Sequence, residues 1–134
     1  MGELSAGGKQ LVSSGTTWER RFGYSRAVRL DRTVFVAGTT AVDEAGKIVG
    51  ANDPYKQAAF IYKKIDKALR EAGSSLKDVV RVRTFVTDIS TWEEVARAQG
   101  EVFVDVRPAA TLVQVSALVE KELLVEIEVD AVIQ

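Results

Sequence analysis

The chain has 134 residues, a formal net charge of −1 and 46% hydrophobic residues, which fits one globular domain with a moderate core. It contains no cysteine and no histidine. This excludes a disulfide framework, a thiolate nucleophile, a Ser-His triad and any metal site built from Cys or His ligands. Catalysis must therefore rely on carboxylates, Arg, Lys, Tyr, hydroxyls, backbone groups or bound water.

The charge balance also bears on partners and location. The 18 basic residues are scattered and are offset by 19 acidic ones, so no positive field favours nucleic acid. The sequence shows no apolar run of signal-peptide or membrane-spanning length. We therefore expect a cytoplasmic protein that binds neither nucleic acid nor membranes, and we expect neither a cofactor nor a metal.

The N-terminal part of the chain predicts little regular structure. Residues 1–9 are Gly-rich and are expected to be frayed or disordered, whereas residues 10–14 form a short edge strand. A Gly-bounded, aromatic-rich loop follows at residues 15–23. Its Trp18 and Phe22 either line a cleft or cap the core, and aromatic residues more often pack than bind.

A β-hairpin is predicted next. Residues 26–30 and 33–39 read as two strands joined by a tight turn, and residues 43–47 form a further turn. Gly38 lies within the second strand. Glycine in a strand often marks a bulge or a close approach of the backbone to a ligand, so this position is a candidate for binding.

A helix is predicted to begin at Asp53 and Pro54, as N-cap and first residue, and to end near Gly73. Its apolar stripe is typical of core packing and consists of Ala58, Ile61, Tyr62, Ile65, Ala68, Leu69 and Ala72.

A strand and a second helix follow. The strand covers residues 79–88, with Val80, Val82 and Val86 on one face and Arg81, Arg83 and Phe85 on the other. The Ser-Thr-Trp-Glu sequence at residues 90–93 is typical of a capping box, and Pro108 prevents continuation of the helix. The predicted inner face of this helix consists of Trp92, Val95, Ala96, Val102 and Phe103.

The last two strands are predicted within residues 107–118 and 124–132. The second alternates strictly, and its polar face carries Glu126, Glu128 and Asp130. Like charges on one strand face repel each other, so this row needs cations from adjacent strands or a ligand. Ion pairs with the arginines of the strand at residues 79–88 are one interpretation, and a ligand site or subunit interface is the other.

The predicted order is therefore β-β-β-α-β-α-β-β over a single domain of residues 1–134. Helices that separate strands in this order predict an α+β fold, with a mixed sheet and two helices packed on one face.

The C-terminal third also carries a resemblance. A Pro-Ala-Ala-Thr motif at residues 108–111, followed by a strand, a turn and Val-Glu-Ile-Glu at residues 125–128, resembles the Rid family. This family is also called YjgF, reactive intermediate deaminase or endoribonuclease L-PSP. The resemblance implies a chorismate-mutase-like homotrimer with clefts between subunits. It also implies hydrolysis of enamines and imines that pyridoxal-phosphate enzymes release.

The resemblance assigns roles to individual residues. Tyr24 matches a cleft tyrosine, Gly38 matches a strand glycine whose backbone approaches the ligand, and Glu126 matches the glutamate proposed to position the hydrolytic water. Ala110 departs from the pattern, because active members have an arginine there that clamps the substrate carboxylate. Arg26 and Arg107 are candidates to supply the lost charge, although a surface or interface ion pair is the alternative for Arg107.

The resemblance leaves three functions open. The leading hypothesis is a cleft protein for a small-molecule metabolite, which hydrolyses an enamine or imine other than a simple 2-imino acid. The alternative is a non-catalytic, ligand-binding or regulatory trimer. A ribonuclease is the third, and the neutral charge and absent histidine weigh against it.

Overall fold

A computed structural model of the chain describes residues 2–4 and 8–134. Its strands are β1 (Gly2–Leu4), β2 (Gln10–Val12), β3 (Ala27–Leu30), β4 (Thr33–Thr40), β5 (Val79–Val86), β6 (Ala109–Gln114) and β7 (Val125–Val132). Its helices are α1 (Thr17–Phe22), α2 (Pro54–Glu71) and α3 (Trp92–Phe103), with 3-10 turns η1 (Leu76–Asp78) and η2 (Ile89–Thr91). No helix among these residues is both long and apolar enough to cross a membrane.

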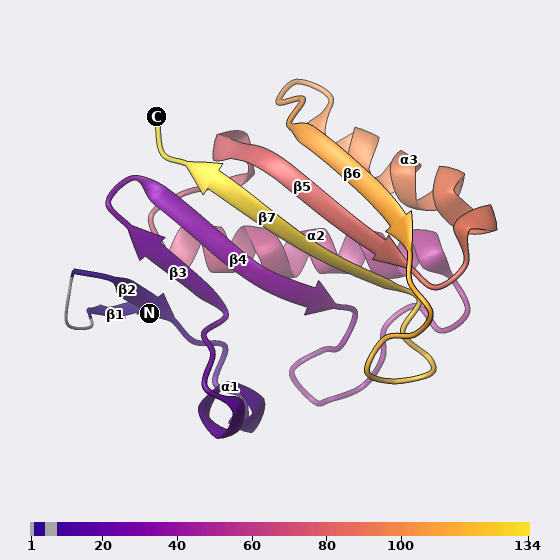
Figure 1. Cartoon of the computed structure of the whole chain (residues 1–134), viewed down its shortest axis with the longest axis horizontal. Coiled ribbons are helices and arrows are strands. Elements are labelled where there is room, and N and C mark those ends of the chain that lie inside the picture. The colour runs from indigo at the N-terminus through magenta and orange to yellow at the C-terminus, as the bar shows by residue number, and fades with distance from the viewer. Residues whose placement is uncertain (1, 5–7) are drawn as a thin grey trace.

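The strands form a mixed sheet with the order β1-β2-β3-β4-β7-β5-β6. The paired strands β5 and β6 are parallel, because α3 carries the chain back across one face between them. The other neighbouring pairs are antiparallel. The long helices α2 and α3 cover the same face of this sheet (Figure 1). The predicted α+β fold, with helices on one face of a mixed sheet, is confirmed.

The core lies between the sheet and these helices. Strand β7 runs through the middle of the sheet, and every second side chain from Val125 to Ala131 is buried. The buried stripe of α2 faces it and includes Ile61, Ile65 and Leu69. Alternating apolar residues on β7 therefore leave the acidic row on the face that the helices do not cover.

The N-terminal region is more regular than the sequence predicts. Gly2–Leu4 pairs with β2 as an antiparallel strand, although residues 1–9 were expected to be frayed. The rest of that expectation concerns residues 1 and 5–9. Of these, residues 1 and 5–7 lie outside the described residues. Residues 17–22, expected in a loop, form helix α1, which ends at Gly23 in the left-handed conformation. Its Trp18 and Phe22 stack on each other, and each is more than half exposed, so they do not cap the core.

The start of α3 also differs from the prediction. Asp88 caps the preceding η2 turn by accepting the Ser90 backbone N–H, and α3 begins only at Trp92 without a side-chain cap. The capping-box prediction is therefore wrong. Trp92 is 50% exposed rather than on the inner face, whereas Val95 and Phe103 are buried as expected.

Local sequence signals succeed at α2. Asp53 accepts the Lys56 backbone N–H, and Pro54 is the first helical residue. Ala72 caps the other end, and Gly73 follows it with a φ of 84°, where glycine avoids the steric cost of a side chain.

In β5, the register shifts between Val79 and Arg81 relative to β7. This shift leaves Val80 exposed instead of on the core face.

Gln57 is a fully buried polar residue that connects α2 to the start of β7. Its Nε2 donates to the carbonyl oxygens of Gly50 and Glu122, at 3.2 and 3.1 Å, and its Oε1 accepts the Leu124 backbone N–H at 2.9 Å. These bonds fix the chain two residues before Glu126. They satisfy backbone groups that burial would otherwise leave without partners.

We predict that Gln57→Leu lowers the free energy of unfolding by about 1–3 kcal/mol, because it leaves these partly buried backbone groups unsatisfied. Urea unfolding followed by circular dichroism measures the change. The matched control is Gln134→Leu, which alters an exposed amide near the C-terminus and should change stability by less than about 0.5 kcal/mol. Equal stability of the Gln57 variant and the wild type would contradict the assigned role.

Candidate active site

The candidate site forms where β4 and β7 pair irregularly. The register between these strands shifts between Val36 and Thr39, so that Gly38 lies in the irregular segment. Glu126 pairs with Thr40 beside it and points toward the glycine. A Cβ atom built on Gly38 would overlap Glu126 Oε2. Only glycine therefore allows the carboxylate to lie against the backbone of β4 here.

Arg26 supports the same segment from the end of the neighbouring strand. Its Nη2 donates to the carbonyl oxygen of Gly38 at 2.5 Å. Its Nε is buried and has no hydrogen-bond partner among the described residues. The guanidinium carbon lies 6.0 Å from the centre of the Tyr24 ring, within the range of a cation–π contact. Tyr24, Arg26, Gly38 and Glu126 thus form one contiguous group.

Burial and charge act in opposite directions on Glu126. Loss of solvent raises the pKa of its carboxyl group, the positive charge of Arg26 lowers this pKa, and the negative charge of Glu128 raises it. The net shift is upward. Burial in turn lowers the pKa of Arg26, while the negative charges of Glu126 and Glu19 and the nearby Tyr24 oppose that shift. The site therefore holds a carboxylate that accepts a proton more readily than an exposed glutamate does.

Glu19 is a further acidic residue near Arg26, and it is buried. It accepts hydrogen bonds from the backbone N–H of Ser14, at 3.2 and 3.3 Å, and from the Ser14 and Thr16 hydroxyls. The sequence interpretation missed it by assigning this region to a loop. The Thr-X-X-Glu spacing at residues 16–19 is a capping-box pattern and was the available signal.

An open hollow of about 760 Å³ lies on the sheet face beside this group. Its lining includes Tyr24, Gly38, Glu19 and Phe35, together with Glu128. Glu126 does not line the hollow itself. Its carboxylate lies against Gly38, and Gly38 is one of the lining residues. A small molecule in the hollow would therefore reach the group from the side that the helices leave open.

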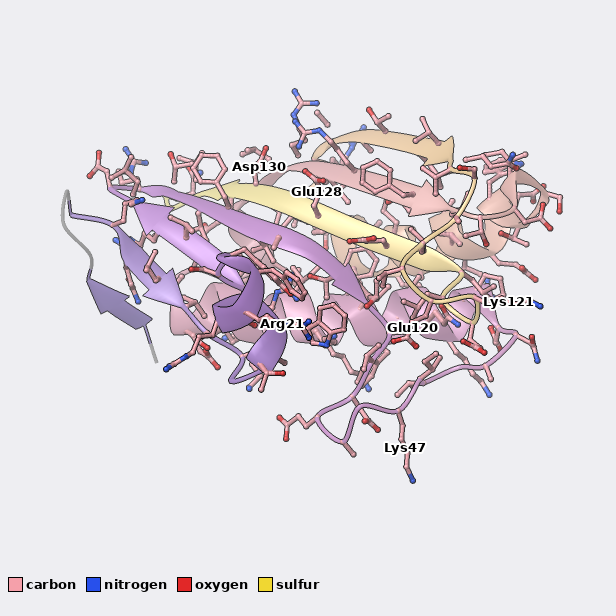
Figure 2. All side chains as sticks on the ribbon, turned by 60° about the horizontal axis from the view of Figure 1, so that its bottom comes forward. Arg21, Lys47, Glu120, Lys121, Glu128 and Asp130 are labelled. Atoms are coloured by element: carbon pink, nitrogen blue, oxygen red, sulfur yellow. The ribbon has the colours of Figure 1, made fainter. Side chains whose placement is uncertain are left out.

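The remaining acids of β7 are engaged in ion pairs. Figure 2 shows Glu128 and Asp130 on the sheet face opposite α2. Arg83 Nη1 lies 3.1 Å from Glu128 Oε2 and 3.5 Å from Asp130 Oδ2. The interpretation of this row as cross-strand ion pairs is thus confirmed for Arg83. Glu126 differs from these two acids, because the positive charge that acts on it comes from Arg26.

Arg107 and Ala110 lie apart from this group within one chain. Arg107 precedes β6 with a φ of 57°, is exposed, and donates its backbone N–H to the Phe103 carbonyl oxygen. β6 begins opposite Arg81, whereas Glu126 pairs with Phe85 toward the other end of β5. Of the two arginines proposed to replace the missing charge, the structure places only Arg26 beside Glu126.

Ala110 faces the helix side of the sheet, in register with the buried Val82. It lines a separate hollow of about 320 Å³ between β6 and α3, together with Trp92, Ala96 and Gln99. The side chains here are mostly apolar or neutral. In the part of the chain that the structure describes, no cluster of three or more Asp and Glu side chains is arranged to hold a metal ion.

Comparison with known proteins places the chain in a family. The sequence model of the family described as Endoribonuclease L-PSP matches residues 17–133. The chain belongs to this family, which includes the YjgF and Rid proteins.

Individual relatives agree with this assignment. The chain is 37% identical over 120 residues to the protein SCO2049 of Streptomyces coelicolor, covering 90% of this chain and 89% of that protein. It is 34% identical over 104 residues to the 3-aminoacrylate deaminase RutC of Acinetobacter baylyi, covering 78% and 82%.

A solved structure is similar over almost its whole length. This is Rv2704 of Mycobacterium tuberculosis, a YjgF/YER057c/UK114 family member. Its TM-score is 0.85 at 43% identity, with 93% of this chain and 99% of that chain covered.

We predict that Gly38→Ala is destabilising by about 1–3 kcal/mol, because the added methyl group overlaps the Glu126 carboxylate. Removing that carboxylate in the double variant Gly38→Ala, Glu126→Ala should relieve the overlap. A coupling energy of about 0.5–3 kcal/mol in a thermal or urea double-mutant cycle is therefore expected.

Gly100→Ala is the matched control for this cycle. Gly100 lies within α3, and an added Cβ would meet nothing within 4 Å. This substitution should stabilise the protein by about 0.5–1 kcal/mol, through helix propensity alone. Additive effects of the Gly38 and Glu126 substitutions would show that the two residues do not meet.

Proposed function

We propose that the protein is a deaminase that hydrolyses a small enamine or imine at the group formed by Tyr24, Arg26, Gly38 and Glu126. The observation that carries this proposal is the partly buried Glu126 carboxylate, which lies against Gly38 with a raised pKa beside a buried guanidinium. Membership of the family and similarity to a protein named as a deaminase support the same reaction class.

The chemistry requires a group that both accepts and returns a proton. Hydrolysis begins when water attacks the electrophilic imine carbon. An enamine first becomes the imine by gaining a proton on carbon and losing one from nitrogen. Glu126 accepts a proton from the attacking water and delivers it to the nitrogen, which gives a carbinolamine. Transfer of the hydroxyl proton to the same nitrogen, again through Glu126, then releases ammonia as the carbonyl forms. A carboxyl group with a raised pKa suits this exchange better than an exposed one, because its pKa lies nearer to neutral pH.

Ala110 narrows the proposed substrate class through the proposed assembly of subunits. It lies apart from Glu126 within one chain, so it would meet the substrate only in a cleft between subunits. A methyl side chain offers neither a charge nor a hydrogen-bond donor to a substrate carboxylate. Arg26 already donates to the Gly38 carbonyl oxygen and is largely buried, so we assign it to holding the Gly38 segment and tuning Glu126. We therefore propose a substrate other than a simple 2-imino acid, with an uncharged group where those acids carry a carboxylate.

We also propose that the protein works as a homotrimer. The sheet face without helices exposes Phe35 and Val113 beside its charged row, and contact with a second copy would cover these side chains. The hollow beside Gly38 is open in one chain, and a neighbouring subunit would close it and exclude water.

We expect Glu126→Gln to lower turnover of an enamine or imine substrate by about 10²–10⁴-fold, since the amide retains the shape but cannot accept the proton. Ammonia release from a panel of enamines and imines measures this loss.

The acidic form of a group with a raised pKa persists to higher pH, so ionised Glu126 should be lost as pH falls through a value above that of an ordinary glutamate. The acid limb of the kcat profile therefore lies at that higher pH.

Two neighbouring substitutions should move this acid limb in opposite directions. Arg26→Gln removes the charge that lowers the Glu126 pKa, so the limb moves to higher pH. Glu128→Gln removes a charge that raises it, so the limb moves to lower pH. Movement of both variants in the same direction, or unchanged turnover in a folded Glu126→Gln variant, would refute the catalytic assignment.

Ala110→Arg should raise activity on 2-iminopropanoate by at least about tenfold, because a buried charged contact is worth about 2–5 kcal/mol. A threonine or serine dehydratase supplies the imino acid, and its decay is followed with the wild type and the variant. Ala110→Met is the control for added length without charge. Light scattering must give the mass of three chains for each protein, and rapid decay with the wild type would contradict the argument from Ala110.

A further inference from the structure

A second, narrower pocket lies on the α2 side of the sheet, away from the open hollow. It has a volume of about 240 Å³ and is bounded by the loop after β2, the loop after β4 and one side of α2. Val42, Phe60 and Ala68 supply its apolar wall, and Ser13 and Ser14 supply hydroxyls. Its volume is below the roughly 300–1,000 Å³ of drug-sized sites, so it suits a ligand of few non-hydrogen atoms.

Lys64 is the unusual residue in this pocket. It projects from α2, is half-buried, and donates from Nζ to the carbonyl oxygen of Thr40 at 2.7 Å. Burial and the positive charge of Arg26 lower the pKa of its ammonium group, Asp43 opposes this shift, and the resulting pKa is about 8. The Thr40 carbonyl oxygen is uncharged. It can accept a hydrogen bond from an uncharged amine as well as from an ammonium group.

The other charged groups that line the pocket come from α2 and the loop after β4. On α2, Lys67 Nζ lies 3.5 Å from Glu71 and 3.8 Å from Glu44 of the loop. Asp43 Oδ1 accepts the backbone N–H groups of Ala45 and Lys47. Lys63 and Arg26 also line the pocket. The acids are thus engaged with other groups, and Arg26 adds a positive charge near Lys64, which disfavours its protonated form.

A lysine in these surroundings is a nucleophile near neutral pH. With a pKa of about 8, about a quarter of the amine is uncharged at pH 7.5, compared with about one part in a thousand for an ordinary lysine. The hydrogen bond to Thr40 uses an N–H and leaves the nitrogen lone pair free. Desolvation of lysine in an apolar pocket is a recognised way to prepare it for attack on a carbonyl carbon.

We propose that Lys64 is a covalent binding site that captures small aldehydes with an apolar body as imines in this pocket. The lysine nitrogen bonds to the aldehyde carbon, and both N–H hydrogens leave with the carbonyl oxygen as water. Phe60, Val42 and Ala68 then contact the apolar body of the bound aldehyde. This proposal does not depend on Glu126, which lies on the opposite face of the sheet and does not line the pocket.

Reductive trapping tests the proposal. The full-length protein is incubated at pH 7.5 with limiting butanal and cyanoborohydride, which fixes an imine as a stable secondary amine, and the labelled peptides are identified by mass spectrometry. Lys64 should be labelled at least about tenfold faster than Lys63 and Lys67, which line the same pocket. The labelling rate should rise with pH around a midpoint of about 8 and then level off.

Variants separate this site from general surface labelling. Lys64→Arg keeps the positive charge and should abolish the fast labelling. The adjacent Lys63→Arg should leave the fast labelling of Lys64 in place. Arg26→Gln removes a charge that lowers the Lys64 pKa, so its midpoint should move to higher pH. If Lys64→Arg does not fold, the peptide map of the wild type still decides the question.

Either of two results would overturn the proposal. One is labelling of Lys63, Lys64 and Lys67 at similar rates in the wild type. The other is a Lys64 rate that keeps rising with pH up to the range of ordinary lysines. Glu126→Gln should be labelled at the wild-type rate, so failure of the deaminase proposal and failure of this one give different results.

Discussion

The approach of the Glu126 carboxylate to the backbone of Gly38 is the constraint on which the rest of the site depends. It requires an irregular register between β4 and β7, the absence of a side chain at Gly38, and a donor that holds the Gly38 carbonyl oxygen. Arg26 supplies that donor. Because the same guanidinium is largely buried, its charge acts on Glu126 with little screening by solvent.

Arg26 also links the two sides of the sheet. Its positive charge lowers the pKa of Glu126 on the open face and the pKa of Lys64 on the α2 side. In one case it opposes the effect of burial, and in the other it adds to that effect. A single buried charge thereby keeps the carboxyl group ionised to lower pH and the amine uncharged to lower pH, so one substitution at this position should alter the chemistry of both groups.

The sequence predicts most of the fold, because its strongest signals are long and periodic. The alternation along β7 and the Asp53-Pro54 start of α2 depend on local geometry that tertiary contacts do not change. The sequence does not predict helix α1, and its prediction for the start of α3 is wrong. Short segments with competing Thr, Ser and Asp caps have several possible local structures. Glu126 and Gly38 could be named from the family resemblance. The contact of Arg26 with Gly38 could not, because it depends on the fold between β3 and β4 and on a register shift that no periodicity reveals.

The proposed site depends most directly on the ionisation of Glu126. Carbon-13 NMR of the glutamate side-chain carboxyl carbons, assigned by comparison with Glu126→Gln, follows that group alone as pH is varied. We expect the Glu126 resonance to titrate above the ordinary glutamate range, because burial outweighs the charge of Arg26. A midpoint at or below the ordinary glutamate value would show that the carboxylate is solvated or dominated by Arg26, and this would contradict the proposed site.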